Sequence, residues 1–344
     1  MRPRSPLHLA LTLGLLTLAS CGEDTAPTQP GAPGDQHPTT PELAWASNSW
    51  TTRATMPTGR HAHAAAVAYT DSGAAILYAI GGLAAPFAQQ SDVVEAYNYT
   101  TNSWTTKAPL PVRLYGTNGV GVIGGKLYLS GGVQDIDQDR SIALPYLFVY
   151  NPQRDTWTRK ANLPHKMSSG VTGVINGKLY VLPGVCTDCS GGTRTRRFYR
   201  YDPAMNAWSS LPWAPHQHAE GAGGVINGKF YVAGGYDSVT TISLLDVYDP
   251  VTNKWTTKAP MPTVRAWISG AVLNKKLFIL GGQGAADLAT VEAYDPATNT
   301  WTTKAPMPTP REQLAAATIT VNGNSKILAA GGLTSLDVNE AYKP

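Results

Sequence analysis

The chain has 344 residues, only 15% of them charged, and a formal net charge of +4. Arg2 and Arg4 lie at the extreme N-terminus, so the remainder is nearly neutral and offers no basic surface for nucleic acid. The 34 glycines and 26 prolines favour many turns and short strands over long helices.

Residues 1–20 have the pattern of a secretion signal. The two arginines precede an apolar run from Leu7 to Ala19, which is too short for a comfortable membrane span. The run ends in Leu18-Ala19-Ser20-Cys21, which resembles the lipobox of bacterial lipoproteins. The resemblance implies cleavage before Cys21, lipidation of that residue and anchoring in the bacterial cell envelope, with Gly22 favouring the outer membrane. The alternative is a plain signal peptide followed by a coincidental cysteine.

Residues 21–44 differ in composition from the rest of the chain. They hold five prolines and almost no bulky apolar side chain. Such a segment cannot bury enough surface to fold on its own. We expect an extended tether that connects the lipid anchor to a folded domain at residues 45–344.

A tyrosine precedes a tryptophan by seven residues five times within residues 45–344: Tyr97/Trp104, Tyr150/Trp157, Tyr201/Trp208, Tyr248/Trp255 and Tyr294/Trp301. Glycine pairs separate these units, and Pro183-Gly184 takes the place of one pair. The tryptophans of these five pairs and the earlier Trp50 follow one another at intervals of 46 to 54 residues. A period near fifty residues indicates a repeat array.

Each repeat predicts four strands. A run of small residues and a tight turn, such as Asn176-Gly177, are followed by an apolar strand that ends in the glycine pair. Asn-Gly favours a two-residue hairpin because both central positions need a positive φ. A third strand ends at the tyrosine, Asp-Pro marks the next turn, and a fourth strand carries the tryptophan.

This pattern of double glycine, tyrosine and tryptophan resembles the kelch repeat. The resemblance covers residues 45–344 and implies an all-β fold, a six-bladed kelch β-propeller. Trp50 has no tyrosine seven residues before it, and the last tyrosine, Tyr342, has no tryptophan after it. We therefore expect residues 48–54 to complete the last blade and to close the ring by pairing the two ends of the domain.

The second-to-third and fourth-to-first connections should share one face of the ring, and the former vary most in length. Basic residues follow each "MP" or "LP" on this face: Arg60, Arg113, Lys166, His216, Arg265 and Arg311. They predict a cationic rim that would bind carboxylates of an acidic sugar or peptide. The alternative is that these side chains brace neighbouring loops and carbonyl groups.

Two enzymes share the scaffold that the resemblance implies. A copper-dependent galactose oxidase would need a cysteine cross-linked to a tyrosine, a pattern that this chain does not meet. A periplasmic sialic-acid epimerase or mutarotase needs only an acid/base pair and an anion clamp. Glu220 with His216 or His218 would serve as the pair, and Arg265 with Arg311 as the clamp, by analogy of fold alone.

Cys186 and Cys189 form a local "CTDC" motif, which in an exported protein predicts a disulfide. A zinc site would need two further ligands, for which His216 and His218 are candidates. The alternating Asp135, Asp137 and Asp139 lack the glycine and glutamate of a calcium loop and predict a solvated loop.

The expected function is recognition of a protein or acidic glycan by a monomeric, envelope-anchored module. We expect no cofactor, no metal and no nucleic-acid partner. The epimerase or mutarotase remains the alternative, and the residues do not identify the ligand.

Overall fold

The computed structural model describes residues 47–85, 88–137, 140–189, 194–333 and 337–344. The predicted signal, Cys21 and the whole tether lie outside these residues, as does Asp139. The described part of the chain contains strands, turns and bends, and no helix in it is long and apolar enough to cross a membrane.

The described residues form six four-stranded antiparallel sheets, here called blades 1 to 6 in chain order. The strands of the first three blades are β3 (Ala64–Tyr69), β4 (Ala75–Ile80), β7 (Val94–Asn98) and β8 (Ser103–Lys107); β9 (Val120–Ile123), β10 (Lys126–Ser130), β13 (Leu147–Asn151) and β14 (Thr156–Arg159); β16 (Val171–Ile175), β17 (Lys178–Leu182), β19 (Phe198–Asp202) and β20 (Ala207–Leu211). The strands of the last three are β21 (Ala222–Ile226), β22 (Lys229–Ala233), β23 (Leu245–Asp249) and β24 (Lys254–Lys258); β25 (Ser269–Leu273), β26 (Lys276–Leu280), β27 (Val291–Asp295) and β28 (Thr300–Lys304); β29 (Ala315–Val321), β30 (Asn324–Ala330), β31 (Asn339–Lys343) and β1 (Ser49–Thr52).

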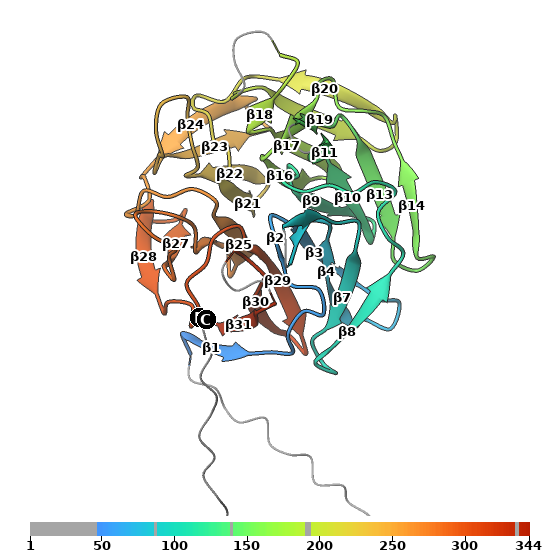
Figure 1. Ribbon diagram of the computed structural model, residues 1–344. Coiled ribbons are helices and arrows are strands. Elements are labelled where there is room, and N and C mark those ends of the chain that lie inside the picture. Colours follow the sequence, from blue (N-terminus) through green and yellow to red (C-terminus); the bar gives the residue numbers. More distant parts are fainter. Residues whose placement is uncertain (1–46, 86–87, 138–139, 190–193, 334–336) are drawn as a thin grey trace, which may run out of the picture. The chain divides into compact units, whose positions relative to one another are not determined.

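The blades are arranged in a ring around a central axis (Figure 1). The first strand of each blade contacts the first strand of the next, from β3 through β9, β16, β21 and β25 to β29, and β29 contacts β3. The ring is therefore continuous.

The N-terminal strand lies at the outer edge of the last blade. β1 pairs with β31, and the register places Trp50 opposite Tyr342. The same pairing of tyrosine and tryptophan occurs in the hairpins of the other blades, as between Tyr294 and Trp301. The seven-residue spacing in the sequence is thus the spacing of two residues that face each other across a hairpin.

Burial follows the position of a strand in its blade. The second strands, such as β26, are buried over most of their length because neighbouring blades cover both of their faces. The outermost strands, such as β28, are largely exposed. The predicted turn at Asn176-Gly177 is confirmed, since both residues have positive φ. In blade 5 Asn274 and Lys275 take the same conformation without glycine.

One face of the ring, here called the turn face, carries the first-to-second and third-to-fourth turns. Each tyrosine of the repeat donates a hydrogen bond to an Asn or Asp in the following turn, as Tyr294 does to Asn299 Oδ1 at 2.8 Å. The same oxygen accepts from the backbone of the preceding blade, at Ala259 N, 3.1 Å away. Trp301 Nε1 donates to Ala259 O at 2.8 Å. The tyrosine, the Asn or Asp and the tryptophan of each repeat therefore join a blade to its neighbour.

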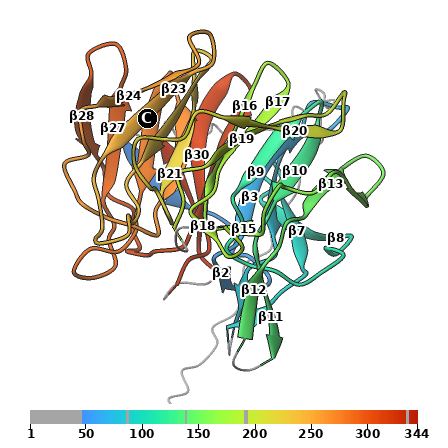
Figure 2. The same ribbon diagram turned by 90° about the horizontal axis from the view of Figure 1, so that it is seen from above.

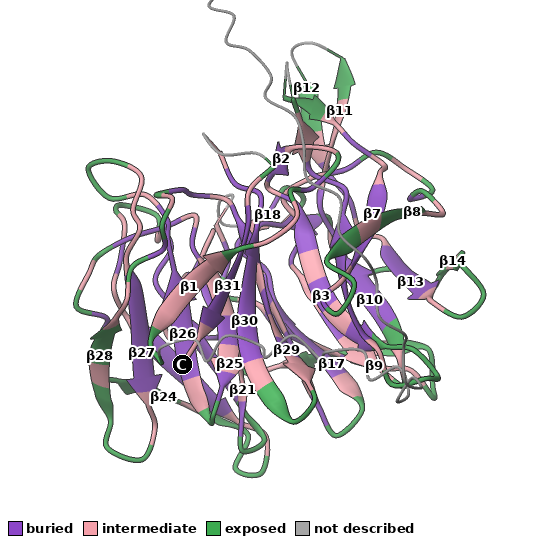
Figure 3. Ribbon diagram, turned by 90° about the horizontal axis from the view of Figure 1, so that it is seen from below, coloured by how far each residue is buried: buried purple, intermediate pink, exposed green. Residues whose placement is uncertain are grey.

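The opposite face, here called the loop face, carries the longer connections. Short ladders lie here: β2 (Arg60–His61), β5 (Leu83–Ala84) and β6 (Gln89–Gln90); β11 (Val133–Asp137) and β12 (Arg140–Ala143); β15 (Met167–Ser168) and β18 (Val185–Cys186). The β11–β12 hairpin projects beyond the ring (Figures 2 and 3).

Candidate functional site

Three of the six basic residues predicted for the rim are buried inside the blades. Arg265 is fully buried and donates to the carbonyl oxygens of Gly281 and Thr290 and to Glu292 Oε2, the last at 2.9 Å. Arg60 and Arg311 make the same kind of pair with Glu95 and Glu340. These guanidinium groups brace the blades and are not available to a ligand, so the structure supports the alternative for these three residues.

The other three basic residues do not occupy equivalent positions. The backbone N–H of the second glycine in each pair donates to one carbonyl oxygen of the next blade. The residues that carry this carbonyl are therefore equivalent, and their place in the blade is here called the arginine position. They are Arg60, Leu114, Met167, Arg265 and Arg311. Arg113 and Lys166 are each one residue earlier and are exposed. His216 is partly exposed and lies 3.0 Å from Asp246. The six residues therefore do not form a cationic rim.

Burial of the arginine position has an electrostatic cost that carboxylates offset. Burial lowers the pKa of Arg60 to about 10, an effect that Glu95 opposes. In blade 4 His218 and Asp246 replace the arginine and glutamate. In blades 2 and 3 apolar or aromatic residues stand at the places of the arginine and the glutamate. In blade 2 these are Leu114 and Phe148, which pack in one core cluster. Met167 clusters with Tyr199 in the same way.

His218 is therefore a structural residue. It is buried, its Nδ1 lies 2.9 Å from Gly234 O, and its Nε2 lies 3.1 Å from Asp246 Oδ2. Burial alone would raise the pKa of Asp246, but hydrogen bonds from His218, Thr257 and His216 outweigh it and the pKa is lowered. The predicted pair of Glu220 with His218 or His216 is not formed, because both histidines are bound to Asp246.

Two residues beyond the arginine position, each blade turns toward the axis. These six residues, here called the mouth residues, all have φ between 50° and 57°: Ala62, Gly116, Ser169, Glu220, Trp267 and Gln313. Five backbone N–H···O bonds of 2.8 to 3.0 Å join them from blade to blade, running from Trp267 through Gln313, Ala62, Gly116 and Ser169 to Glu220. Left-handed conformation at residues other than glycine is uncommon and is often kept for a functional reason.

The mouth residues surround the opening of a cavity of about 420 Å³ along the axis. The cavity is lined by the first strands of the blades, where small residues such as Ala66, Gly223 and Gly270 leave the space open. His63 and Asn118 also line it, and the polar side-chain atoms of both have no hydrogen-bond partner among the described residues. Polar groups in this state are rare in protein interiors.

One side of the mouth combines an aromatic pair with opposite charges. The Trp267 and Tyr236 rings are 5.4 Å apart, edge to face, and the Arg194 guanidinium lies 5.3 Å from the Tyr236 ring. Burial raises the pKa of Glu220, while Ser169 and Arg194 oppose the shift. Next to Trp267 in the following blade, Gln313 Oε1 lies 2.8 Å from His61 Nδ1. The mouth can thus offer an aromatic surface, a carboxylate and an amide to a ligand.

Sequence reasoning did not identify the mouth residues. Of these six residues the sequence predicted only Glu220 as a site residue, in a pair with His216 or His218. The signal was available, because the position equivalent to Arg265 lies three residues after a proline in every blade and the mouth residue follows two residues later. The choice of basic side chains selected Arg113, Lys166 and His216 instead, which lie one or two residues too early.

The remaining predicted sites do not line the cavity. Cys186 and Cys189 form a disulfide, as expected. Asp135 Oδ1 accepts hydrogen bonds from Tyr115 and Ser141, and Asp137 pairs with Arg140. These aspartates therefore belong to the β11–β12 hairpin, where a solvated loop was predicted.

Comparison with known proteins places this architecture among repeat propellers. A family model described as the KLHDC2/KLHL20/DRC7 Kelch-repeats domain matches residues 120–332, and a Kelch motif model matches residues 76–111. Kelch-like protein terF of Aspergillus terreus is 29% identical over 231 residues, which cover 64% of this chain and 47% of that protein. Kelch repeat and BTB domain-containing protein 12 of Homo sapiens is 28% identical over 179 residues, or 46% of this chain and 28% of that protein.

The chain thus spans about half, or less, of the length of these curated relatives. Among solved structures, that of YjhT matches with a TM-score of 0.66 and 17% identity. The match covers 83% of this chain and 95% of YjhT, and it is a likeness of fold.

Proposed function

The chain belongs to the kelch-repeat family, and on that premise we propose that it is a recognition module that binds a protein or glycan at the mouth of its central cavity. Kelch repeats generally mediate protein interactions. The site differs from the cationic rim expected from the sequence, because it is built from the mouth residues.

One observation carries this proposal. Six backbone positions have the same conformation and five are linked to the next by the same hydrogen bond, yet they carry a methyl group, a hydrogen, a hydroxyl, a carboxylate, an indole and an amide. A purely structural role would favour one residue type, as it does for the tyrosines and tryptophans of the turn face. Unlike side chains on a uniform frame are typical of a recognition surface.

The chemistry of the mouth favours a ligand with an apolar face and hydrogen-bonding groups. Trp267 is only half-buried and supplies a surface for a sugar ring or an aliphatic or aromatic side chain. Glu220 and Gln313 are placed to bind hydroxyl or amide groups beside it. The prediction of an acidic ligand has less support, because Arg60, Arg265 and Arg311 are buried and cannot contact it.

The second candidate is a sugar epimerase or mutarotase. It rests on Glu220, a carboxylate at the cavity mouth whose pKa is raised by burial, as a general acid requires near neutral pH. The expected histidine partner and arginine clamp are engaged elsewhere, so Glu220 would act with Ser169 or Gln313 as orienting groups. We rank this activity second for that reason.

A pair of substitutions tests the recognition site. Binding is measured on a glycan array and by cross-linking in an envelope extract, with Trp267→Ala as the variant and Val251→Ala, an exposed turn-face change, as the matched control. Loss of a central aromatic contact should weaken binding about tenfold or more. Equal binding by the wild type and Trp267→Ala would contradict the proposal.

The enzymatic candidate has a separate test. Exchange spectroscopy by NMR follows the interconversion of sialic-acid anomers with wild type and Glu220→Gln. Acceleration by the wild type that Glu220→Gln removes would establish the second candidate, and an unchanged anomer-exchange rate would eliminate it.

We also propose that the module is lipid-anchored to the bacterial envelope through Cys21, preferably at the outer membrane. The supporting observation is the lipobox-like Leu18-Ala19-Ser20-Cys21 after the apolar run. Substitution Cys21→Ser should move the protein from the membrane fraction to the soluble fraction, while Cys186→Ser should not.

A further inference from the structure

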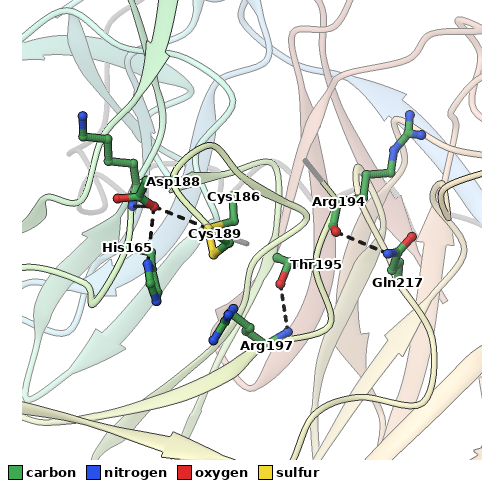
Figure 4. Close-up of a disulfide and its surroundings, with 9 residues drawn as sticks. His165, Cys186, Asp188, Cys189, Arg194, Thr195, Arg197 and Gln217 are labelled. Atoms are coloured by element: carbon green, nitrogen blue, oxygen red, sulfur yellow. Dashed lines mark hydrogen bonds and ion pairs between the residues drawn. A yellow bond between two sulfur atoms is a disulfide. The ribbon is translucent and has the colours of Figure 1, made fainter. Parts of the chain in front are cut away.

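The second-to-third loop of blade 3 and the connection that precedes this blade bring four metal-ligand side chains together away from the mouth. The β15–β18 ladder pairs Met167 with Cys186, which places His165 beside the "CTDC" loop (Figure 4). One ligand atom from each of His165, Cys186, Asp188 and Cys189 lies within 4.8 Å of every other.

The backbone holds this cluster in place. Lys166 N donates to Asp188 Oδ1 at 2.9 Å, and Thr187 N donates to Lys166 O at 3.0 Å. His165 Nδ1 lies 3.4 Å and Cys186 Sγ 3.5 Å from the same carboxylate oxygen. The four groups thus converge on one point from two chain segments, which the β15–β18 ladder and a further main-chain hydrogen bond join.

The donor set and spacing suit a tetrahedral zinc site. Zinc binds thiolate sulfur at about 2.3 Å and imidazole nitrogen or carboxylate oxygen at about 2.0–2.2 Å, so its ligands lie roughly 3.3–3.8 Å from one another. Two cysteines separated by two residues are a common half of such a site. The observed separations need only small side-chain movements once the sulfur atoms are no longer bonded to each other.

We propose that reduction of the Cys186–Cys189 disulfide creates a zinc site of His165, Cys186, Asp188 and Cys189. A dithiol reductant of the thioredoxin class would supply two electrons and two protons to the disulfide and would itself become a disulfide. Metal binding then releases one proton from each thiol, because only thiolates coordinate. A disulfide oxidant of the same class would take two electrons from the two thiolates and two protons from water to become a dithiol, which restores the Cys186–Cys189 bond and expels the ion.

The surroundings permit this exchange. On one side Cys186 packs with Leu163, Met167 and Tyr199, which shield the sulfur atoms from water. On the other side the side chains of His165 and Asp188 are 31% and 41% exposed, so a reductant and a metal ion can reach them. The ligand pair first considered for zinc, His216 and His218, is bound to Asp246 instead.

The consequence of metal binding would be local to the loop face. The same loop continues to Thr195 and Arg194, and Arg194 lies against Tyr236 at the mouth. A metal ion would fix the loop in its reduced state as the disulfide fixes it in the oxidised state.

The test uses the full chain with Cys21→Ser in every sample, which leaves Cys186 and Cys189 as the two cysteines. Protein reduced without oxygen is titrated with Co²⁺, whose thiolate charge-transfer and tetrahedral ligand-field bands report coordination, and then with Zn²⁺ as competitor. We expect one equivalent of Co²⁺ to bind, to show both sets of bands and to be displaced by Zn²⁺. The oxidised protein should show neither.

Variants assign the ligands. Cys186→Ser with Cys189→Ser should abolish the bands, and His165→Ala should weaken binding about tenfold or more, whereas the control His216→Ala should match the parent. The proposal is overturned if the reduced parent binds no more Co²⁺ than the double serine variant, or if His165→Ala binds as tightly as His216→Ala.

Discussion

The turn face and the loop face of this propeller use one backbone in opposite ways. On the turn face the blades repeat one set of contacts, in which a tyrosine, an Asn or Asp and a tryptophan join neighbouring blades. On the loop face the mouth residues repeat only the backbone geometry. On the turn face the same side chains therefore recur from blade to blade. On the loop face the φ angles and main-chain hydrogen bonds recur, but the side chains differ.

The arginine position lies between these two extremes. Blades 1, 5 and 6 bury an arginine with a glutamate, and blade 4 buries a histidine with an aspartate. Blades 2 and 3 use Leu114 with Phe148 and Met167 with Tyr199. The same place in the fold accepts either solution, because a buried ion pair and an apolar pair of similar size can be of similar stability. Removal of only one residue from such a pair should destabilise the fold.

The largest effect is expected from breaking one ion pair. Glu292→Ala leaves the buried Arg265 guanidinium with carbonyl acceptors only and should lower the free energy of unfolding by about 3–5 kcal/mol. Denaturation in urea would measure the change.

A double variant serves as its control. Arg265→Met with Glu292→Phe gives blade 5 an apolar pair like those in blades 2 and 3 and should recover most of the lost stability. A double variant as unstable as Glu292→Ala would show that the two kinds of pair are not interchangeable.

The next effect concerns the turn face. Asn299→Ala removes an acceptor shared by Tyr294 and Ala259 and places alanine at φ 55°, which together should cost about 2 kcal/mol. Asn48 makes the same two contacts with Tyr342 and Ala305 where the chain ends meet. Asn48→Ala should therefore cost the same by thermal unfolding; a much larger loss would mean that the closing blade is the weakest of the ring.

A smaller, pH-dependent effect is expected next to the mouth. Burial and Asp287 raise the pKa of Glu312 to about 7 from its usual 4.5. The folded protein therefore binds this proton more tightly than the unfolded chain, and the stabilisation is lost as the pH rises from about 4.5 to 7.

Glu312→Gln should accordingly raise the free energy of unfolding at pH 8 by roughly 1–3 kcal/mol, measured by denaturant titration. At pH 4 the same substitution should change it little. Val251→Ala on the exposed turn face removes no titratable group, so this control should show no such dependence. A gain of equal size at both pH values would contradict the assignment to Glu312.

The smallest effect on stability is expected at the mouth itself. Trp267→Ala removes a half-buried ring whose aromatic contact is Tyr236, and alanine already occupies the equivalent position at residue 62. The free energy of unfolding should change by less than about 1 kcal/mol, as thermal unfolding would show, although ligand binding should fall. A loss comparable to that of Glu292→Ala would assign Trp267 to the scaffold.

By itself the sequence determined the all-β repeat architecture, the placement of tyrosine and tryptophan on the third and fourth strands, the Asn-Gly hairpins and the completion of the last blade by the strand that carries Trp50. These features are local or periodic, and they follow from turn chemistry and from a spacing that is constant along the chain. Only the tertiary structure decided that Arg60, Arg265 and Arg311 point inward, that His218 binds Asp246, and which six residues surround the cavity. Whether a basic side chain faces water or a buried carboxylate depends on partners about 30 residues away in a neighbouring strand, and no local pattern near the arginine specifies that direction.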